Sequence, residues 1–372
     1  MLYPIEKAPQ LLLIVLFSLL FTSVGAQGRL SGKVVDRATQ KPLAGISITL
    51  QDTTVGTTTD SAGAFRFTDL AIKTYNILFT GVGYQPQTLF NIVIGTGNET
   101  ILNIELEPAV ASLSEVVVRS NRRTAAAATI ESPLSVQRLT TGEIRSNPGG
   151  NFDISKVIQA LPGVGGGVGG GGFRNDIIIR GGAPNENVFY LDGIEIPVIN
   201  HFQTQGSSGG PQGILNVSFI EDVKLSSSAF EARYDNALSS VFQFRQRTGN
   251  PNRVQGNVRL SATDLSATLE GPLSKNKKTT FLASARRSYL QFLFTLIDLP
   301  IRPNYWDFQT KVTHQLNEKT TISFIGLGAI DEFSFAQLKD ATPEKLYVLN
   351  SNPFINQWNY TAGVTLKRLV QD

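Results

Sequence analysis

Residues 186–198 read ENVFYLDGIEIPV, which is two short apolar runs on either side of an Asp-Gly pair. Asp and Gly tolerate the positive φ angles that a two-residue hairpin turn requires. The stretch therefore predicts a tight β-hairpin, with Asn187 to Leu191 and Ile194 to Val198 as its strands and Asp192-Gly193 as its turn. Such an apolar hairpin gives this part of the chain a rigid core, around which the neighbouring segments can pack.

The residues before the hairpin predict a helix and a buried strand within a unit that spans residues 136–250. Ile154, Val157, Ile158 and Leu161 follow helical spacing, which indicates an amphipathic helix. Asn151 or Asp153 can cap its start, and Pro162-Gly163 ends it. A glycine tract and the run NDIIIRGG come next, and a long polar loop begins after the hairpin at Asn200. The unit is therefore of the α+β kind.

Composition excludes several classes of protein. The 372 residues include 33 Lys+Arg against 30 Asp+Glu, a balance that argues against a nucleic-acid partner. With no cysteine, the chain has no disulfide framework, no thiolate zinc site and no cysteine nucleophile. Its two histidines form no H-E-x-x-H motif, so we expect no metal, no cofactor and no enzyme activity. The 34 glycines and 22 phenylalanines suit a mainly β fold with many turns.

The first 26 residues predict a secretory signal peptide. A weakly positive start is followed by an apolar run from Leu11 to Phe21 and by the small residues Val24-Gly25-Ala26. The alternative is a membrane anchor, but the run is shorter than the roughly 20 residues that a spanning helix needs. We expect cleavage after Ala26.

Residues 27–108 predict a small β-sandwich. Five strand candidates alternate with turn signals, and they are Leu30 to Val35, Gly45 to Leu50, Ala64 to Phe67, Tyr75 to Thr80 and Thr100 to Leu106. Strands at this spacing are typical of a transthyretin-like or immunoglobulin-like sandwich.

Residues 109–135 differ from the sandwich because they combine one short β-branched run with a segment that lacks apolar periodicity. The run is LSEVVV, Leu113 to Val118. An isolated strand-forming segment can add itself to the sheet edge of another protein. The alternative is that it forms the last strand of the sandwich, or simply a linker.

Residues 251–372 contain strand candidates of roughly ten residues joined in places by short polar turns. In DFQTKVTHQL, Phe308, Val312, His314 and Leu316 share one face, and Gln309, Lys311, Thr313 and Gln315 share the other. This pattern is typical of an antiparallel transmembrane β-barrel, although a soluble all-β domain is the alternative.

The order of these units resembles the beginning of a TonB-dependent outer-membrane receptor of the Bacteroidetes kind. The segment from Gly32 to Phe65 resembles a carboxypeptidase-regulatory-like domain, and Ile177 to Phe202 resembles the plug domain. Phe230 to Phe244 resembles the last strand region of the plug. The resemblance assigns the TonB box to Leu113, Ser114, Glu115, Val116, Val117 and Val118, and the plug hairpin motif to Arg180, Gly181, Gly182, Tyr190, Asp192 and Gly193.

The resemblance implies energised uptake of a ligand such as a siderophore, a glycan or a peptide. TonB, with its ExbB–ExbD motor, would capture the TonB box in the periplasm, where the sandwich would also lie, while the barrel would contact outer-membrane lipid. A surface lipoprotein is a further candidate partner. His201, Phe202 and Gln203 follow the hairpin and are candidates for ligand contact, although such residues more often support loop structure.

Two other functions stay open on the sequence. A non-transporting surface or periplasmic binding protein would use the sandwich as an adhesion module. A secreted peptidase is suggested only by the regulatory-like domain. About 120 residues after 252 allow about five to seven strands, too few to close a barrel of about 22. We therefore expect the sequence to be part of a longer protein or a truncated product that cannot transport alone.

Overall fold

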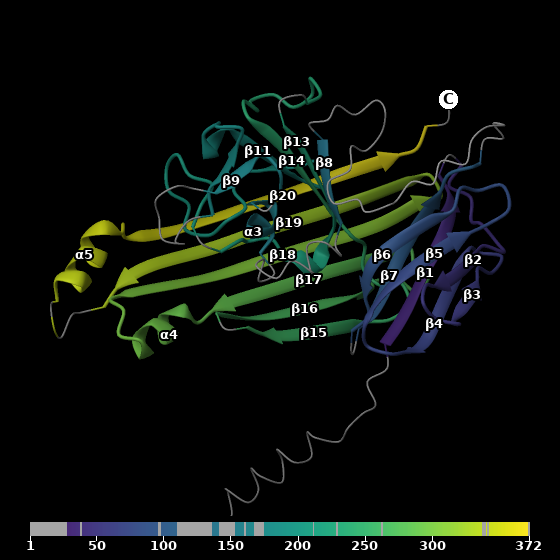
Figure 1. The fold of residues 1–372 in the computed structure, drawn as a ribbon, viewed down its shortest axis with the longest axis horizontal. Coiled ribbons are helices and arrows are strands. Elements are labelled where there is room, and N and C mark those ends of the chain that lie inside the picture. Colours follow the sequence, from purple (N-terminus) through teal and green to yellow (C-terminus); the bar gives the residue numbers. More distant parts are fainter. Residues whose placement is uncertain are drawn as a thin grey trace, which may run out of the picture.

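The structure, a computed structural model, describes residues 28–37, 39–95, 98–109, 136–140, 153–159, 161–166, 175–210, 212–227, 230–261, 263–336, 340 and 342–370. Three units follow one another along the chain (Figure 1). We call them the N-terminal sandwich, the central unit and the long-strand sheet. The predicted signal peptide and the predicted TonB box, 113–118, lie outside the described residues.

The N-terminal sandwich consists of two sheets that enclose one apolar core. One sheet has the order β4-β1-β7 and the other β3-β2-β5-β6. Their strands are β1 Gly28–Asp36, β2 Ser47–Leu50, β3 Gly56–Thr58, β4 Ala64–Leu70, β5 Thr74–Thr80, β6 Gln87–Val93 and β7 Glu99–Leu106. The core includes an edge-to-face pair, Phe65 and Phe79, with ring centroids 5.8 Å apart.

The sandwich has two strands that the sequence did not predict, although all five predicted strands are present. β3 is only three residues long and lies at a sheet edge. β6 shows no buried position, so it lacks the alternation that identifies a half-buried strand. Pairing with β2 and β5, rather than the local pattern, makes these segments strands.

The central unit contains a five-stranded sheet of order β12-β11-β14-β13-β8. Its other elements are a short helix, a two-stranded sheet and two 3-10 turns. The bounds are β8 Val136–Thr140, α3 Ile154–Gln159, β9 Val164–Gly166, β10 Ile177–Ile179, η2 Pro184–Glu186, β11 Asn187–Leu191, β12 Ile194–Ile196, η3 Val217–Phe219, β13 Ile220–Ser227 and β14 Ser240–Gln246. The predicted helix begins at a capping carboxylate, because Asp153 Oδ1 accepts a hydrogen bond from the backbone N–H of Ser155 at 2.9 Å.

The predicted hairpin is confirmed. β11 pairs with β12 in antiparallel register, from Phe189 opposite Ile196 to Leu191 opposite Ile194. Asp192 and Gly193 have φ angles of 50° and 88°, so both turn residues take the left-handed conformation. β11 also pairs in parallel with β14, so β11 lies inside the sheet and β12 forms its edge.

The long-strand sheet is an antiparallel meander in which each strand pairs with the next, from β15 to β20. Its elements are β15 Gln255–Leu260, β16 Asp264–Pro272, β17 Thr279–Ser288, α4 Leu290–Leu296, β18 Ile301–Asn317, β19 Thr320–Phe335, α5 Pro343–Ser351 and β20 Ile355–Arg368. The expected strand length of roughly ten residues is wrong for the last three, which have 17, 16 and 14 residues. They extend because their neighbours stay paired over the whole length.

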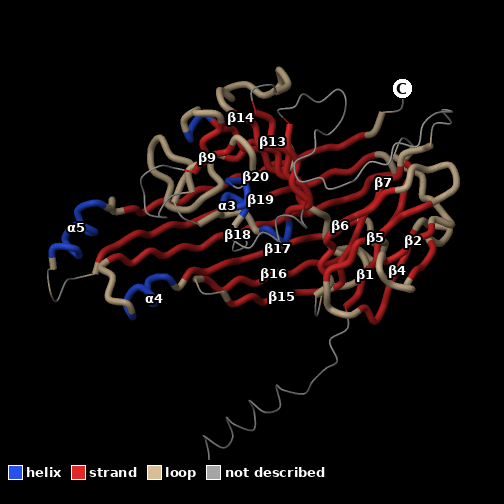
Figure 2. The backbone as a smooth tube through the Cα atoms, viewed as in Figure 1, coloured by secondary structure: helices blue, strands red, loops and turns tan. Residues whose placement is uncertain are grey.

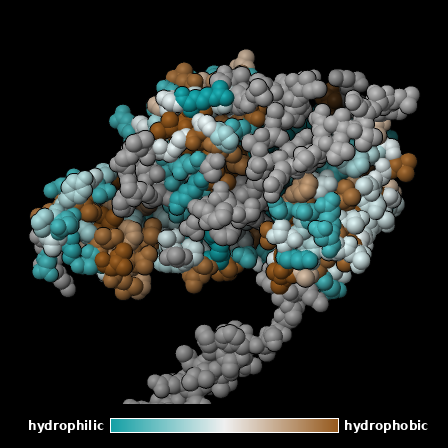
Figure 3. Space-filling model, in the orientation of Figure 1, coloured by the Kyte–Doolittle hydropathy of each residue, from teal (hydrophilic) through white to brown (hydrophobic). Residues whose placement is uncertain are grey.

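The sandwich and the two outer helices lie at opposite ends of the long strands (Figure 2). α4 carries exposed apolar side chains, among them Phe292 and Leu296, and apolar surface gathers over this end of the molecule (Figure 3). Among the described residues, we find no helix with the length and apolar character needed to cross a membrane.

Candidate functional site at the contact of the central unit with the long-strand sheet

A buried histidine of the central unit lies between two carboxylates of the long-strand sheet. His201 follows β12, at the start of the polar loop. Its Nδ1 lies 2.6 Å from Oδ1 of Asp331 on β19, and its Nε2 lies 3.1 Å from Oδ2 of Asp307 on β18. The backbone N–H of Phe202 also donates to Asp331, at 2.8 Å. All these side chains are buried, so the contact replaces water on both partners.

A guanidinium and a phenol complete this cluster. Arg286 on β17 donates from Nε to Oδ2 of Asp307 at 2.6 Å, and its Nη2 reaches the carbonyl oxygens of Gly213 and Ile214. The ring of Tyr305 stacks on His201 with centroids 3.9 Å apart. With His201 protonated, two cations balance two carboxylates, and buried charges are tolerated when they are paired in this way.

The carboxylates control the protonation of His201. Burial alone would lower the pKa of this imidazole, but the hydrogen bonds and negative charges of Asp307 and Asp331 outweigh burial and raise the pKa above the usual 6.5. A protonated ring can donate from both nitrogens, whereas a neutral ring can donate from only one. The geometry with one carboxylate at each nitrogen therefore fits the imidazolium.

A second polar contact joins the hairpin turn to β18. Nζ of Lys311 lies 2.9 Å from Oδ2 of Asp192 and donates to the backbone oxygen of Gln246 at 2.8 Å. Gln309, two residues earlier on the same face, donates to Oε1 of Gln246 at 2.7 Å and accepts from the backbone N–H of Asn216 at 2.8 Å. The inward face of β18 thus holds the central unit by polar groups.

A third contact, nearer the far edge of the sheet, is apolar. Ile325, Leu327 and Ala329 on β19 belong to the same buried cluster as the core of the central unit. On β20, a Cβ at Gly363 would stand 2.2 Å from Cδ1 of Ile194. The glycine at this position therefore lets the hairpin approach the backbone of β20.

The structure brings the predicted hairpin motif together in the central unit. Arg180 and Gly181 have φ angles of 49° and 85°, which turn the chain after β10. A Cβ at Gly182 would lie 2.5 Å from Oγ of Ser239, so this position is closely packed. The ring of Tyr190 contacts that of Tyr234, with centroids 5.1 Å apart. Asp192 and Gly193 form the turn that meets Lys311.

The predicted ligand-contact residues lie at the same contact. His201 and Phe202 are buried against the sheet, and Gln203 is partly buried, with Nε2 3.4 Å from the backbone oxygen of Ser207. Both ring nitrogens of His201 are engaged by carboxylates. A role in ligand binding stays a prediction.

Sequence reasoning missed Asp307, Asp331, Arg286 and the pairing of Lys311. The available signal was the alternation along β18, where the inward positions carry Asp307, Gln309, Lys311 and Thr313 and the outward positions carry Trp306 and Phe308. Among the residues that the structure describes, no group of three or more histidines and carboxylates could hold a metal ion.

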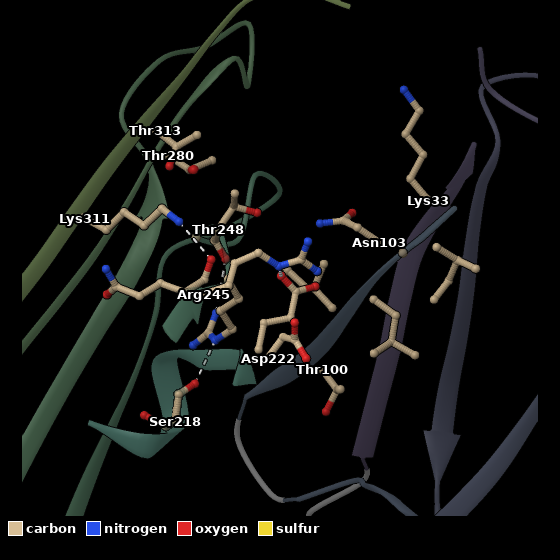
Figure 4. Close-up of a pocket in the computed structure, with 18 of the residues that line it drawn as sticks. Lys33, Thr100, Asn103, Ser218, Asp222, Arg245, Thr248, Thr280, Lys311 and Thr313 are labelled. Carbon is tan, nitrogen blue, oxygen red and sulfur yellow. Dashed lines mark hydrogen bonds and ion pairs between the residues drawn. The ribbon is translucent and has the colours of Figure 1, made fainter. Parts of the chain in front are cut away.

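An open cavity of about 3590 Å³ lies between the three units. Figure 4 shows Lys311, Thr280 and Thr313 of the long-strand sheet on one side of it, and Lys33, Thr100 and Asn103 of the sandwich on the other. Ser218, Asp222 and Arg245 reach it from the central unit. Side chains with hydroxyl or charged groups and apolar side chains both line the cavity.

Two family models match the chain. Residues 30–118 match the carboxypeptidase-regulatory-like domain, and residues 128–241 match the TonB-dependent receptor plug domain. The first match extends past the expected end of the sandwich and includes 113–118. The second begins before residue 136 and ends inside β14. A comparison with curated proteins finds no match.

Solved structures resemble the chain at low identity. A mutant of the ferric enterobactin receptor PfeA from Pseudomonas aeruginosa, in complex with enterobactin, is 17% identical with a TM-score of 0.44; the match covers 63% of this chain and 38% of that one. The siderophore receptor PirA from Acinetobacter baumannii is 17% identical with a TM-score of 0.43, over 63% and 37%. This chain thus spans less than two fifths of the length of either receptor.

Proposed function

We propose that this chain, which carries a TonB-dependent receptor plug domain behind a carboxypeptidase-regulatory-like domain, acts in TonB-dependent uptake of a ligand across the outer membrane. The family of the plug is one of transport receptors, not of enzymes. In this proposal the central unit is the plug and the long-strand sheet is part of the surrounding wall.

The observation that carries the proposal is the distribution of side chains on the long-strand sheet. On β18 the face towards the plug is polar, and the outer face is apolar. The face of β18 towards the central unit buries Asp307, Gln309 and Lys311. The opposite face exposes large apolar residues. A wall between lipid and a polar lumen requires this arrangement, because lipid cannot satisfy polar groups.

The exposed face continues the same pattern across neighbouring strands. Trp358 and Val364 on β20 are 70% and 62% exposed, and both point away from the central unit. Trp306 stacks on Phe308 with centroids 6.0 Å apart, and Trp358 stacks on Tyr360 at 5.7 Å. Tryptophan and tyrosine favour the boundary between lipid and water, which supports an outer-membrane location for this sheet.

The TonB box is assigned to Leu113–Val118, with TonB and its ExbB–ExbD motor as partners. The run stands at the end of the first matched segment, ahead of the plug match, and has the β-branched character that strand addition needs. The family match that extends to residue 118 supports the other assignment, a last strand of the sandwich. In either case the sandwich and this segment would lie in the periplasm.

Capture by TonB tests the assignment. Val117→Pro removes a backbone donor that strand pairing needs, whereas Val117→Ile keeps the donor and the β-branched side chain. We expect purified full-length chain in detergent to bind the periplasmic domain of TonB as wild type and as Val117→Ile, and to lose binding as Val117→Pro. Unchanged binding of the proline variant would reject the TonB box.

The proposed function itself is tested by cell fractionation and by TonB binding of the unmodified chain. We expect the protein in the outer-membrane fraction, soluble only with detergent. A chain that stays in aqueous solution and does not bind TonB would instead be the non-transporting binding protein. The ligand contacts proposed for His201, Phe202 and Gln203 can be tested once a ligand is known. Competition binding with iron complexes, glycans and peptides would identify that ligand.

A further inference from the structure

The N-terminal sandwich is joined to the long-strand sheet by a reciprocal pair of hydrogen bonds. The backbone N–H of Glu99, the first residue of β7, donates to Oε1 of Gln255 at 3.0 Å. Nε2 of Gln255, the first residue of β15, donates back to the backbone oxygen of Glu99 at 3.2 Å. The glutamine amide thereby pairs with β7 as a neighbouring strand would.

The side chain of Glu99 adds a buried charge to the same junction. Its carboxylate is 0% exposed and lies 3.1 Å from Nη2 of Arg66 in the sandwich and 3.5 Å from Nε of Arg253, just before β15. Burial alone would raise the pKa of Glu99, but the Ser31 hydroxyl and the two arginines hold the pKa below its usual value. The carboxylate is therefore ionised at neutral pH and needs both cations.

Gln255 is in turn held by the strand beside it. Its Nε2 also donates to Oε1 of Glu270 on β16, at 2.9 Å. Glu270 is buried and receives two bonds from Arg247, at 2.5 Å and 2.9 Å. The Nε of Arg247 donates to the backbone oxygen of Ser218 in the central unit at 3.0 Å. Continuous contacts thus run from the sandwich through the sheet to the central unit.

We propose that these contacts form a relay by which the position of the central unit controls how firmly the sandwich is docked on the sheet. If the end of the central unit moves and takes Arg247 away, Glu270 becomes a buried carboxylate without its cation. Gln255 then loses the arrangement that orients its amide towards Glu99. The sandwich, which forms one side of the cavity in Figure 4, would be released as a result.

The relay goes beyond the proposed function and does not depend on it, because it concerns the docking of one part of this chain on another. It gives the sandwich a specific role: whether it is docked or released depends on the position of the central unit. Arg247 acts in it as a positioning residue, since the hydrogen bonds of the described residues link it to the sandwich through Glu270 and Gln255.

Distance measurement between two spin labels tests the relay directly. The chain has no cysteine, so Ser61→Cys in the sandwich and Lys275→Cys in the turn after β16 give two unique labelling sites, both exposed and outside the relay. In the full-length protein we expect one narrow distance peak. We expect both Gln255→Ala and Arg247→Ala to replace it by a broad distribution.

Arg245→Ala is the matched control. Arg245 lies two residues before Arg247 and pairs with Glu221 at 3.4 Å, but in that pair Arg245 is exposed and Glu221 is partly exposed. We expect the control to keep the narrow peak. Arg247→Lys keeps the charge but loses the two-pronged contact, so it should broaden the peak less than Arg247→Ala and remain informative if the alanine variant does not fold. A broad distribution in the wild type would overturn docking. A narrow peak in both Arg247 variants, with a broad one in Gln255→Ala, would overturn the relay.

Discussion

His201 and Asp331 are 130 residues apart in sequence, yet Nδ1 of the one lies 2.6 Å from Oδ1 of the other. The pair joins a loop of the central unit to a strand of the surrounding sheet, and neither side chain is open to solvent. The strength of this pair therefore contributes to how tightly the central unit is bound to the sheet.

Removal of the His201 side chain should weaken the contact between the central unit and the sheet. His201→Leu leaves Asp307 and Asp331 buried with one cation fewer, which costs about 3–5 kcal/mol for a broken buried pair. The measurement is the urea concentration at which protease begins to cut the central unit in the full-length protein. The control is His314→Leu, since the other histidine is only partly buried and bonds Thr279. If both variants lowered the urea concentration for cleavage by the same amount, the special role of His201 would be contradicted.

The same contact should depend on pH. The raised pKa of His201 means that its charged form is favoured on folding, so the stabilisation is complete below the unfolded value of 6.5 and is lost as the pH rises through the higher folded value. The urea midpoint of the wild type should thus fall, relative to that of His201→Leu, as the pH is raised from acid to alkaline. A difference between the two proteins that stays constant with pH would argue against a protonated His201.

The stability of the contact between the hairpin turn and β18 should depend on the ion pair of Asp192 with Lys311. Asp192→Asn keeps a residue that tolerates positive φ but leaves Lys311 as a buried cation, at a cost of about 3–5 kcal/mol. The double variant Asp192→Asn with Lys311→Met removes the cation as well and should recover most of that loss. The urea midpoints of the wild type, of the single variants Asp192→Asn and Lys311→Met, and of the double variant form a double-mutant cycle. Additive losses would show that the two side chains are not coupled.

The approach of the hairpin to β20 should be limited by the glycine at 363. Gly363→Ala places a Cβ against Ile194, and overpacking of this kind costs about 1–3 kcal/mol. Gly328→Ala on β19 is the control, because its nearest neighbour stands 3.6 Å away. The shortened side chain of Ile194→Ala should rescue Gly363→Ala. The readout is again the urea midpoint. If the double variant is no more stable than Gly363→Ala alone, the strain does not come from contact with Ile194.

Local chemistry in the sequence determined much of the fold. Asp192-Gly193 predicts the hairpin because few other pairs accept two positive φ angles, and helical spacing from Ile154 onward predicts α3 with Asp153 as its cap. Alternation along β18 predicts which side chains share a face. Each of these depends on neighbours in the chain, so a sequence pattern can reveal it.

Tertiary structure alone decided which of those faces meet. The position of His201 between Asp307 and Asp331 depends on the register of β18 with β19 and on where the central unit sits against them. The junction of Glu99 with Gln255, 156 residues apart, has the same origin. Hydrogen bonds form only within a few tenths of an ångström of their ideal length, and such precision arises from packing of the whole molecule rather than from any one segment.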